Sequence, residues 1–167
     1  SNIYIDYFQD VFKNYLQTTQ TSPDTLTALV FHLPYTKMGL KALRSVLPLV
    51  DAEKQAQWLA HFEHARQLNR QVGNLYTGSL YLSLLSQLLT DPQLQPGNRL
   101  GLFSYGSGAE GEFYTGVIQP DYQTGLDHGL PQRLARRRRV SVAEYEALFS
   151  HQLQWRADDQ SVSYADD

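Results

Sequence analysis

The sequence contains no cysteine among its 167 residues. This absence excludes disulfide bonds, thiolate metal sites and a thiol nucleophile within the chain. No apolar run approaches the roughly 20 residues that a membrane-spanning helix needs, and no signal-peptide pattern opens the chain. Neither sign of charge is in large excess, because the net charge is −3, and this balance does not favour nucleic acid or an anionic membrane as a partner. We therefore expect a soluble, cytoplasmic protein.

The composition is that of one folded domain. With 167 residues, of which 42% are hydrophobic, the chain can bury a sizeable core. Its apolar pattern begins by about Ile3 without an initiator methionine, as we expect of a fragment or a processed product. After Trp155 the sequence is acidic and polar. We predict a domain over residues 1–151 and a polar, acidic and disordered tail over 152–167.

Hydrophobic periodicity and turn chemistry predict alternating helices and strands. Apolar residues recur every three or four positions in the helices, and the strands are compact apolar runs. Helix starts are marked by Pro34, by Asp51 and by a capping box of Ser141 with Glu144. The predicted elements are helices over residues 5–16, 35–46, 51–70, an apolar helix after Gly73-Asn74 and a helix over 141–151, with strands over 26–32, 99–105 and 112–119. This order, closed by a β-hairpin, indicates a layered α/β architecture with a mixed sheet packed by helices.

Polar residues of interest follow the first predicted strand. His32 ends this strand, where α/β proteins place ligand-facing groups. An imidazole with a pKa of about 6.5 can donate or accept a proton near neutrality, although a hydrogen-bonded core histidine is the alternative. Lys37 and Lys41 lie four residues apart, so both ammonium groups project from one face of the next helix. They would either meet the phosphates of a ligand or be solvated.

A second group of candidates lies later in the chain. Asn74 precedes the apolar helix, where it would orient a substrate carbonyl if buried, or otherwise serve as a cap or turn residue. Five glycines lie between Gly101 and Gly116, more than one hairpin turn requires. The segment Gly106-Ser107-Gly108 leaves backbone N–H groups uncovered, which suits an oxyanion hole or the close approach of a ligand. A tight hairpin with a bulge is the alternative.

Three other charged or titratable features carry little functional signal. His61 and His64 lack evident further metal ligands, so we expect a solvated helix face. Residues 136–139 are four arginines, too short a basic patch on an acidic chain to indicate a nucleic-acid site. Glu110 and Glu112 fall on one strand face, and we expect a partly exposed pair whose role stays open.

Four segments, taken together, resemble one protein family. They are VFHLPYTKMGLKAL, VGNLYTGSLYLSLLS, GLFSYGSGAEGEFYTG and VSVAEYEALF. In this order, from about Tyr7 to about Phe149, they are similar to the C-terminal half of bacterial 3-hydroxy-3-methylglutaryl-CoA synthase. The resemblance implies a thiolase-like layered α/β sandwich, of which this chain supplies the second half. It also implies a homodimeric acyltransferase of the mevalonate pathway that condenses acetyl-CoA with acetoacetyl-CoA and needs no metal or further cofactor.

The resemblance assigns roles to individual residues. It implies that His32 contacts the acetoacetyl group and donates a proton as the ketone becomes a hydroxyl. It implies that Asn74 lines the substrate site. The backbone N–H of Ser107, between Gly106 and Gly108, would help to hold the thioester oxygen.

The resemblance also implies what this chain lacks. The nucleophilic cysteine and the catalytic glutamate of the family belong to its N-terminal half, and this chain has no cysteine. We therefore expect the chain to be inactive alone and to need that half as a partner. Lys37, and less directly Lys41, would lie near the CoA phosphates. Two alternatives stay open: a synthase that adds β-branches to carrier-bound polyketides, and a non-catalytic acyl-CoA-binding module.

Overall fold

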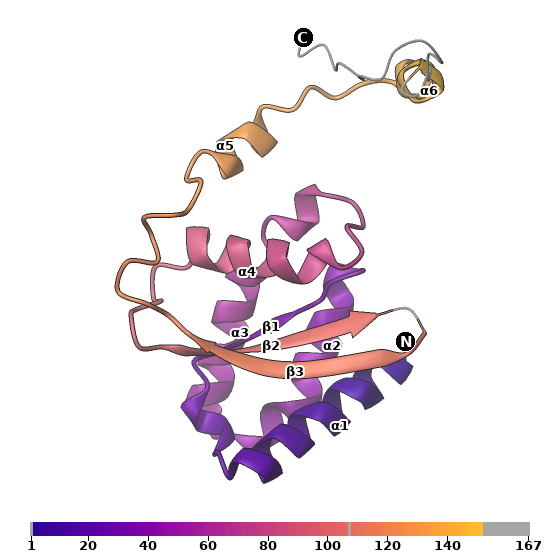
Figure 1. The fold of residues 1–167 in the computed structure, drawn as a ribbon. Helices are drawn as coiled ribbons and strands as arrows, with labels where there is room; N and C mark the ends of the chain where they lie inside the picture. Colours follow the sequence, from indigo (N-terminus) through magenta and orange to yellow (C-terminus); the bar gives the residue numbers. More distant parts are fainter. Residues whose placement is uncertain (1, 107, 152–167) are drawn as a thin grey trace, which may run out of the picture. The chain divides into compact units, whose positions relative to one another are not determined.

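The computed structural model describes residues 2–106 and 108–151 of the chain. They fall into two compact units, divided between Pro131 and Gln132. The larger unit contains α1 (Asn2–Thr19), β1 (Ala28–Phe31), α2 (Thr36–Val46), α3 (Ala52–Ala65), α4 (Gly78–Thr90), β2 (Arg99–Gly106) and β3 (Glu110–Val117) (Figure 1). Short 3₁₀ helices occupy Pro23–Thr25, Leu47–Leu49 and Asn69–Gln71.

The sheet has three strands in the order β1-β2-β3. β1 pairs in parallel with β2, with Phe31 opposite Phe103, and β2 pairs antiparallel with β3. The predicted mixed sheet with a closing hairpin is therefore confirmed. Because β1 and β2 are parallel, their carboxyl ends meet at the same edge of the sheet. That edge carries the residues that follow Phe31 and Phe103.

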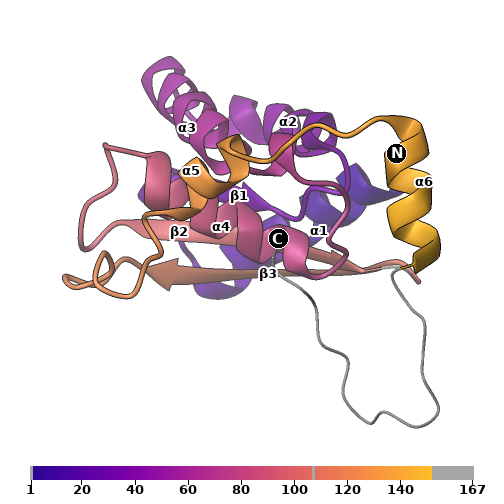
Figure 2. The same ribbon diagram turned by 90° about the horizontal axis from the view of Figure 1, so that it is seen from above.

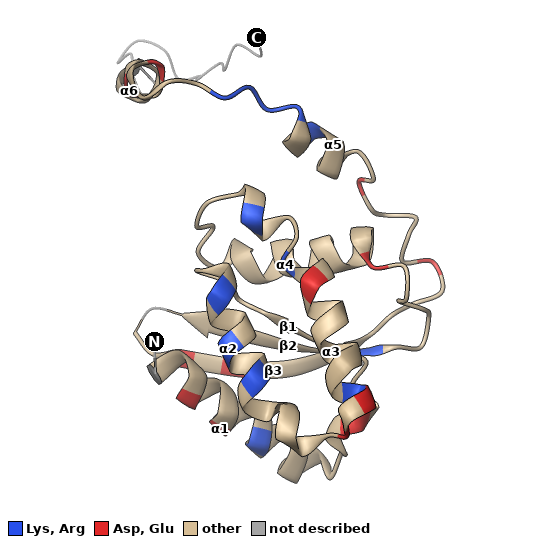
Figure 3. Cartoon of the chain, turned by 180° about the vertical axis from the view of Figure 1, so that it is seen from behind, with Lys and Arg blue, Asp and Glu red and all other residues tan. Residues whose placement is uncertain are grey.

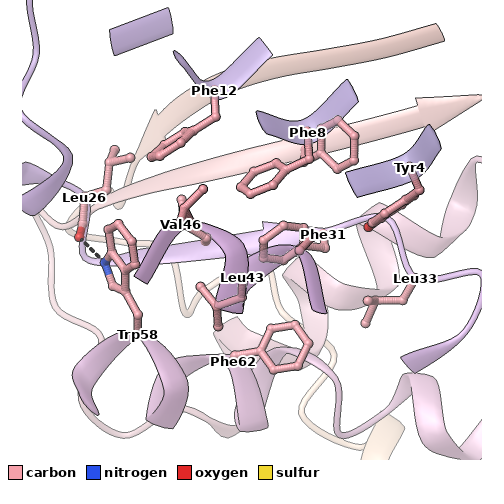
Figure 4. Packing of buried hydrophobic residues seen from close by; sticks show 13 residues of the cluster. Tyr4, Phe8, Phe12, Leu26, Phe31, Leu33, Leu43, Val46, Trp58 and Phe62 are labelled. Carbon is pink, nitrogen blue, oxygen red and sulfur yellow. Dashed lines mark hydrogen bonds between the residues drawn. The ribbon is translucent and has the colours of Figure 1, made fainter. Parts of the chain in front are cut away.

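An aromatic core fills the space between the sheet and α1, α2 and α3 (Figure 4). Tyr4, Phe8 and Phe12 recur four residues apart on α1 and are almost fully buried, as expected of one apolar helix stripe. The ring of Phe8 meets those of Phe31 and Phe103 edge to face, at centroid distances of 4.9 and 5.2 Å. This packing fixes α1 beneath the strands that lead to the candidate site.

Helix α4 covers the opposite face of the sheet (Figures 1 and 2). Its Leu80 packs in a second cluster with Ala28, Val30, Leu100 and Leu102. All four residues of β1 are buried because the strand faces a hydrophobic cluster on each side. This explains why the sequence of β1 is a continuous apolar run instead of an alternating one.

One glycine of the hairpin serves packing within the chain. A Cβ at Gly101 would lie 2.5 Å from the ring of Phe113 and 2.8 Å from a methyl group of Leu29, so no side chain fits there. Part of the excess of glycine between residues 101 and 116 is thus explained by side chains of this chain, without a ligand.

Helix α3 is shorter than predicted. Its α-helical part ends at Ala65, so the predicted continuation to residue 70 is wrong. In a longer helix the N–H of Leu68 would bond to the carbonyl of His64. Instead, the hydroxyl of Ser86 on α4 lies between them: it accepts from the Leu68 N–H at 3.1 Å and donates to the His64 carbonyl at 2.6 Å. A side chain from a distant helix ends α3 there.

The smaller unit contains α6 (Val142–His151), and the six-residue helix α5 (Leu130–Ala135) spans the division between the units. The predicted capping box at the start of α6 is confirmed. The N–H of Ser141 donates to Glu144 Oε2 at 2.7 Å, and the N–H of Glu144 donates to Ser141 Oγ at 3.2 Å. Helix α5 was not predicted from the sequence. The predicted tail, 152–167, lies outside the described residues.

Candidate functional site

A cavity of about 290 Å³ opens where β1 and β2 end. Three segments that are distant in the sequence form its wall: the turn after β1, the loop before α4 and the end of β2. The lining residues are His32, Pro34, Asn74, Tyr76, Thr77, Tyr105 and Gly106. The fold thus brings together three of the positions singled out from the sequence, His32, Asn74 and Gly106.

The backbone around His32 is fixed by hydrogen bonds on both sides. Its N–H donates to the carbonyl of Phe103 at 2.9 Å, which extends the β1–β2 pairing by one residue. Its carbonyl accepts from the hydroxyl of Tyr4 at 2.6 Å. The N–H of the next residue, Leu33, donates to Ser79 Oγ at 2.7 Å. These contacts hold the backbone that presents the imidazole to the cavity.

The environment of His32 favours the neutral imidazole. The residue is only 7% exposed, and burial lowers its pKa below the ordinary value because a charged ring loses hydration. A neutral imidazole offers one N–H donor and one acceptor nitrogen. The ring centroid lies 6.4 Å from that of Tyr105, the next wall of the cavity. A ligand between these residues would therefore contact a group capable of proton transfer.

Asn74 is exposed. The sequence predicts a substrate-orienting role for it only if it is buried, so this condition is not met. Its Oδ1 accepts from the N–H of Tyr76 at 2.8 Å, which makes it a turn residue. Tyr76 itself has a left-handed backbone with φ of 51°. Because the turn occupies Oδ1, the amide NH₂ of Asn74 is the group left to donate to a ligand in the cavity that this loop lines.

The hairpin tip contributes Gly106 to the cavity. A Cβ at Gly106 would meet no atom within 4 Å, so packing within the chain does not require glycine there. Gly108 has φ of 99°, a left-handed conformation that favours glycine. It is exposed and is not among the residues that line the cavity. Ser107, the third predicted residue of this segment, lies outside the described residues.

Lys37 and Lys41 are exposed on α2, and neither lines the cavity. Arg44 continues the same basic face, and α2 contains no acidic residue. Figure 3 shows this series of basic positions along the helix. Since α2 begins two residues after Pro34, which lines the cavity, Lys37 follows the cavity wall closely in the sequence.

The expectation of a solvated His61 is wrong. His61 is 5% exposed, and its Nδ1 lies 2.5 Å from Oδ2 of the equally buried Asp91. Gln87 donates to the same oxygen at 3.0 Å. Burial alone would raise the pKa of Asp91, but hydrogen bonds from His61, Gln87 and the backbone of Gln93 outweigh it and lower that pKa. This cluster joins α3 to the end of α4.

The remaining charged features agree with the sequence interpretation. Glu110 and Glu112 are exposed on β3, and Arg138 makes an exposed ion pair with Glu144 at 3.2 Å. Within residues 2–106 and 108–151, no group of three or more histidine and acidic side chains is placed to hold a metal ion. Over the same residues, no helix is long and apolar enough to cross a membrane.

Four residues of the cavity wall were not among the site candidates from the sequence: Pro34, noted only as a helix start, and Tyr76, Thr77 and Tyr105. Tyr76 and Thr77 directly follow Asn74 and Leu75, so a loop candidate could have been extended to its neighbours. Tyr105 directly precedes Gly106, so it could have been reached in the same way. Its place beside His32 follows only from the pairing of β1 with β2.

Comparisons with known proteins converge on one family. Residues 49–162 match the family model described as hydroxymethylglutaryl-coenzyme A synthase C terminal. The hydroxymethylglutaryl-CoA synthase of Enterococcus faecalis is 44% identical over 151 residues, which are 90% of this chain and 39% of the relative. The polyketide biosynthesis 3-hydroxy-3-methylglutaryl-ACP synthase PksG of Bacillus subtilis is 30% identical over 153 residues, 87% of this chain and 36% of that protein.

A solved structure gives the same result for the fold. The crystal structure of an HMG-CoA synthase complexed with CoA matches with a TM-score of 0.81 at 35% identity, over 86% of this chain and 37% of that one. The predicted thiolase-like α/β fold is therefore confirmed. The chain spans less than two fifths of the length of each of these three proteins.

Proposed function

The chain belongs to the hydroxymethylglutaryl-CoA synthase family, as a C-terminal region, and on this premise we propose that it supplies part of the active site for condensing acetyl-CoA with acetoacetyl-CoA. The product is HMG-CoA, on the mevalonate route to isoprenoids in the cytoplasm. The observation that carries the proposal is the single cavity shared by His32, Asn74 and Gly106. No cofactor beyond the CoA thioesters is part of the proposal.

His32 is the proposed proton donor. When a carbanion adds to the ketone of acetoacetyl-CoA, negative charge develops on the ketone oxygen, which must gain a proton. Burial lowers the pKa of His32, which makes its protonated form a stronger acid and also leaves a smaller fraction of the rings protonated near neutrality. A positioned general acid contributes about 100-fold or more to the rate. The fixed backbone of His32 supports this role because it limits the positions the ring can adopt.

The other wall residues are proposed to orient the acyl group. A volume of about 290 Å³ is near the lower end of ligand pockets, which start at about 300 Å³. It suits a small acyl group better than a whole CoA thioester. The hairpin backbone beginning at Gly106 would donate to the thioester oxygen, and each such donor is worth roughly 3 kcal/mol in the barrier. The amide of Asn74 would bind from the loop before α4.

The remainder of the CoA would leave the cavity along α2. Lys37 is the better candidate for its phosphates and Lys41 the weaker, since Lys37 lies nearer the end of α2 that begins beside Pro34. Support comes from the exposed basic face of α2, which no acidic residue of the helix interrupts. Phosphates bind such lysines as point charges.

The partner of this chain is proposed to be the N-terminal half of the synthase, with the complete enzyme a homodimer. That half would bring the cysteine that forms the acyl-enzyme and the glutamate that helps to remove the methyl proton. An apolar groove of about 390 Å³ runs beside α4 over β2 and β3, and such a surface is typical of an interaction site. Its apolar wall includes Leu84, Leu88, Leu100, Leu102, Ile118 and Tyr122. We assign this groove to the missing half, because matched relatives are more than twice as long as this chain.

The test is complementation. The 167-residue chain alone should catalyse no condensation, and mixing it with the N-terminal half of the synthase should restore release of CoA from acetyl-CoA and acetoacetyl-CoA. Activity of the chain alone, or none in a mixture shown to associate, would contradict the proposal.

The similarity to an ACP synthase supports a second candidate function, that of a synthase acting on carrier-bound polyketides. The same mixture separates the two, because the alternative requires faster turnover with a carrier-bound acceptor than with acetoacetyl-CoA. The third possibility is a binding module without turnover. Tight calorimetric binding of acetoacetyl-CoA by the chain alone would favour it, since the proposed cleft is shared between halves.

A further inference from the structure

A buried hydroxyl joins the two loops that flank the cavity. Ser79, in the first turn of α4, is 1% exposed, and its Oγ accepts the N–H of Leu33 at 2.7 Å. Leu33 directly follows His32, and Ser79 follows the loop that begins with Asn74. The contact therefore connects the turn that carries His32 with the loop that carries Asn74.

The backbone of Ser79 is itself fixed by hydrogen bonds. Its N–H donates to the carbonyl of Tyr76 at 3.0 Å. Its carbonyl accepts from Nδ2 of the buried Asn69 at 3.2 Å and from the hydroxyl of Ser83 at 3.0 Å. Since three neighbours fix the backbone, the direction of the Ser79 hydroxyl toward Leu33 is set by the start of α4.

The N–H of Leu33 depends on this hydroxyl. The hydrogen bonds between β1 and β2 end where the N–H of His32 donates to the carbonyl of Phe103. The N–H of Leu33 lies beyond this pairing. Leu33 is 5% exposed, and a buried N–H without an acceptor is unfavourable. Removing the hydroxyl leaves this N–H without its acceptor, and we expect the turn, with His32, to shift until the N–H reaches water or another acceptor.

We propose that Ser79 is a positioning residue of the site, whose hydroxyl sets the separation between the His32 turn and the Asn74 loop so that both contact one ligand. The identity of that ligand as an acyl thioester rests on the proposed function. Ser79 does not line the cavity, so its effect passes through the backbone of Leu33.

The chain offers a matched control on the same helix. Ser86 is also fully buried, and its Oγ also accepts a loop N–H, that of Leu68 at 3.1 Å. Neither Ser86 nor Leu68 lines the cavity. Ser79→Ala and Ser86→Ala thus each remove a buried hydroxyl that accepts a loop N–H. The Ser86 hydroxyl also donates to the carbonyl of His64, and only Ser79→Ala acts beside His32.

The direct test uses the full 167-residue chain and nuclear magnetic resonance. In Ser79→Ala we expect the amide of Leu33 to exchange with solvent at least tenfold faster. The pKa of the His32 ring should also rise toward its ordinary value, because the turn opens to water. Ser86→Ala should leave both quantities unchanged. An unchanged Leu33 amide and His32 titration in Ser79→Ala would overturn the proposal.

A second pair of variants decides the matter if Ser79→Ala does not fold. Thr and Val have nearly the same shape, but only Thr carries the hydroxyl. Ser79→Thr should keep the protected Leu33 amide and Ser79→Val should lose it; equal behaviour of the two would overturn the proposal.

Turnover in the mixture with the N-terminal half gives an independent measurement. We expect Ser79→Ala to lower kcat at least tenfold with little change in KM, and to shift the acidic limb of the pH profile. If even the wild-type mixture is inactive, the proposed function fails, whereas the resonance measurements still decide the positioning role.

Discussion

The hydroxyl of Tyr4 donates a 2.6 Å hydrogen bond to the carbonyl of His32. Tyr4 lies in the first turns of α1 and His32 just past β1, so the bond ties the opening helix of the chain to the candidate site. Burial raises the pKa of Tyr4 well above its usual value, so the hydroxyl stays protonated and keeps donating. The same ring packs edge to face on Phe103 and Tyr105, each at 5.2 Å.

The first prediction concerns this bond. Tyr4→Phe keeps the ring packing but leaves the His32 carbonyl without its donor, so the free energy of unfolding should fall by about 1–3 kcal/mol. Tyr15→Phe, which removes a half-buried hydroxyl 3.3 Å from Thr115 Oγ1, should change it by less than about 0.5 kcal/mol. Urea titration of both variants measures the difference. Equal effects would show that the Tyr4 hydroxyl adds nothing specific.

The second prediction concerns the proton donor. In the mixture with the N-terminal half, His32→Ala should lower kcat by about 100-fold or more. His128→Ala, which changes an exposed histidine in the same unit, should keep wild-type turnover. Initial rates of CoA release measure both. Near-normal rates for His32→Ala would remove this residue from the chemistry.

The third prediction concerns pH. The pKa of His32 is lower in the folded chain than its ordinary value of about 6.5. Near and below that value the unfolded chain therefore binds the proton more readily, and acid favours unfolding. The contribution of His32 to stability is complete above about pH 6.5 and is lost as the pH falls through the folded pKa. His32→Gln should flatten the fall of the unfolding free energy between about pH 7 and 5. A wild-type slope in the variant would contradict this.

The fourth prediction concerns the buried contact of His61 with Asp91. Asp91→Ala leaves His61 and Gln87 without the oxygen they share, and should reduce the unfolding free energy by about 3–5 kcal/mol. Glu63→Ala removes the ion pairs of an exposed carboxylate with Arg66 and Arg70 and should cost at most about 1 kcal/mol. Thermal or urea unfolding tests both. A loss of less than about 1 kcal/mol in Asp91→Ala would contradict the prediction and mean that water replaces the carboxylate.

The fifth prediction concerns the groove beside α4. Leu88→Lys places a charge on its apolar wall and should weaken association with the N-terminal half at least tenfold, about 1.4 kcal/mol or more. Leu49→Lys changes an apolar residue that is 54% exposed outside the groove, and should leave association unchanged. Titration calorimetry compares the two, with circular dichroism as the check of folding. Unchanged binding by Leu88→Lys would place the interface elsewhere.

Local patterns in the sequence predict most of the elements. The apolar run of β1, the stripe of α1 and the Ser141–Glu144 box depend on neighbours a few residues apart, so they can be recognised without the fold. His32 was found for the same reason, as a polar residue ending an apolar strand. Its companion Tyr105 was missed because only the β1–β2 pairing brings the two together.

The errors have the same physical origin. Helix α3 ends at Ala65 because Ser86, on another helix, accepts the N–H of Leu68. His61 was expected in solvent because its partner Asp91 belongs to another element. In both cases a polar group from α4 or its end completes a hydrogen bond that local spacing does not reveal.

The parallel pairing of β1 with β2 has a consequence for how the molecule is made. Ala28 lies opposite Leu100, so the ribosome must deliver α2, α3 and α4 before β1 can acquire its neighbour. Closing such a large loop slows folding, whereas the intervening helices form from local contacts. During synthesis the turn with His32 therefore stays next to an unpaired β1, and the pocket is completed only when the β2–β3 hairpin has left the ribosome.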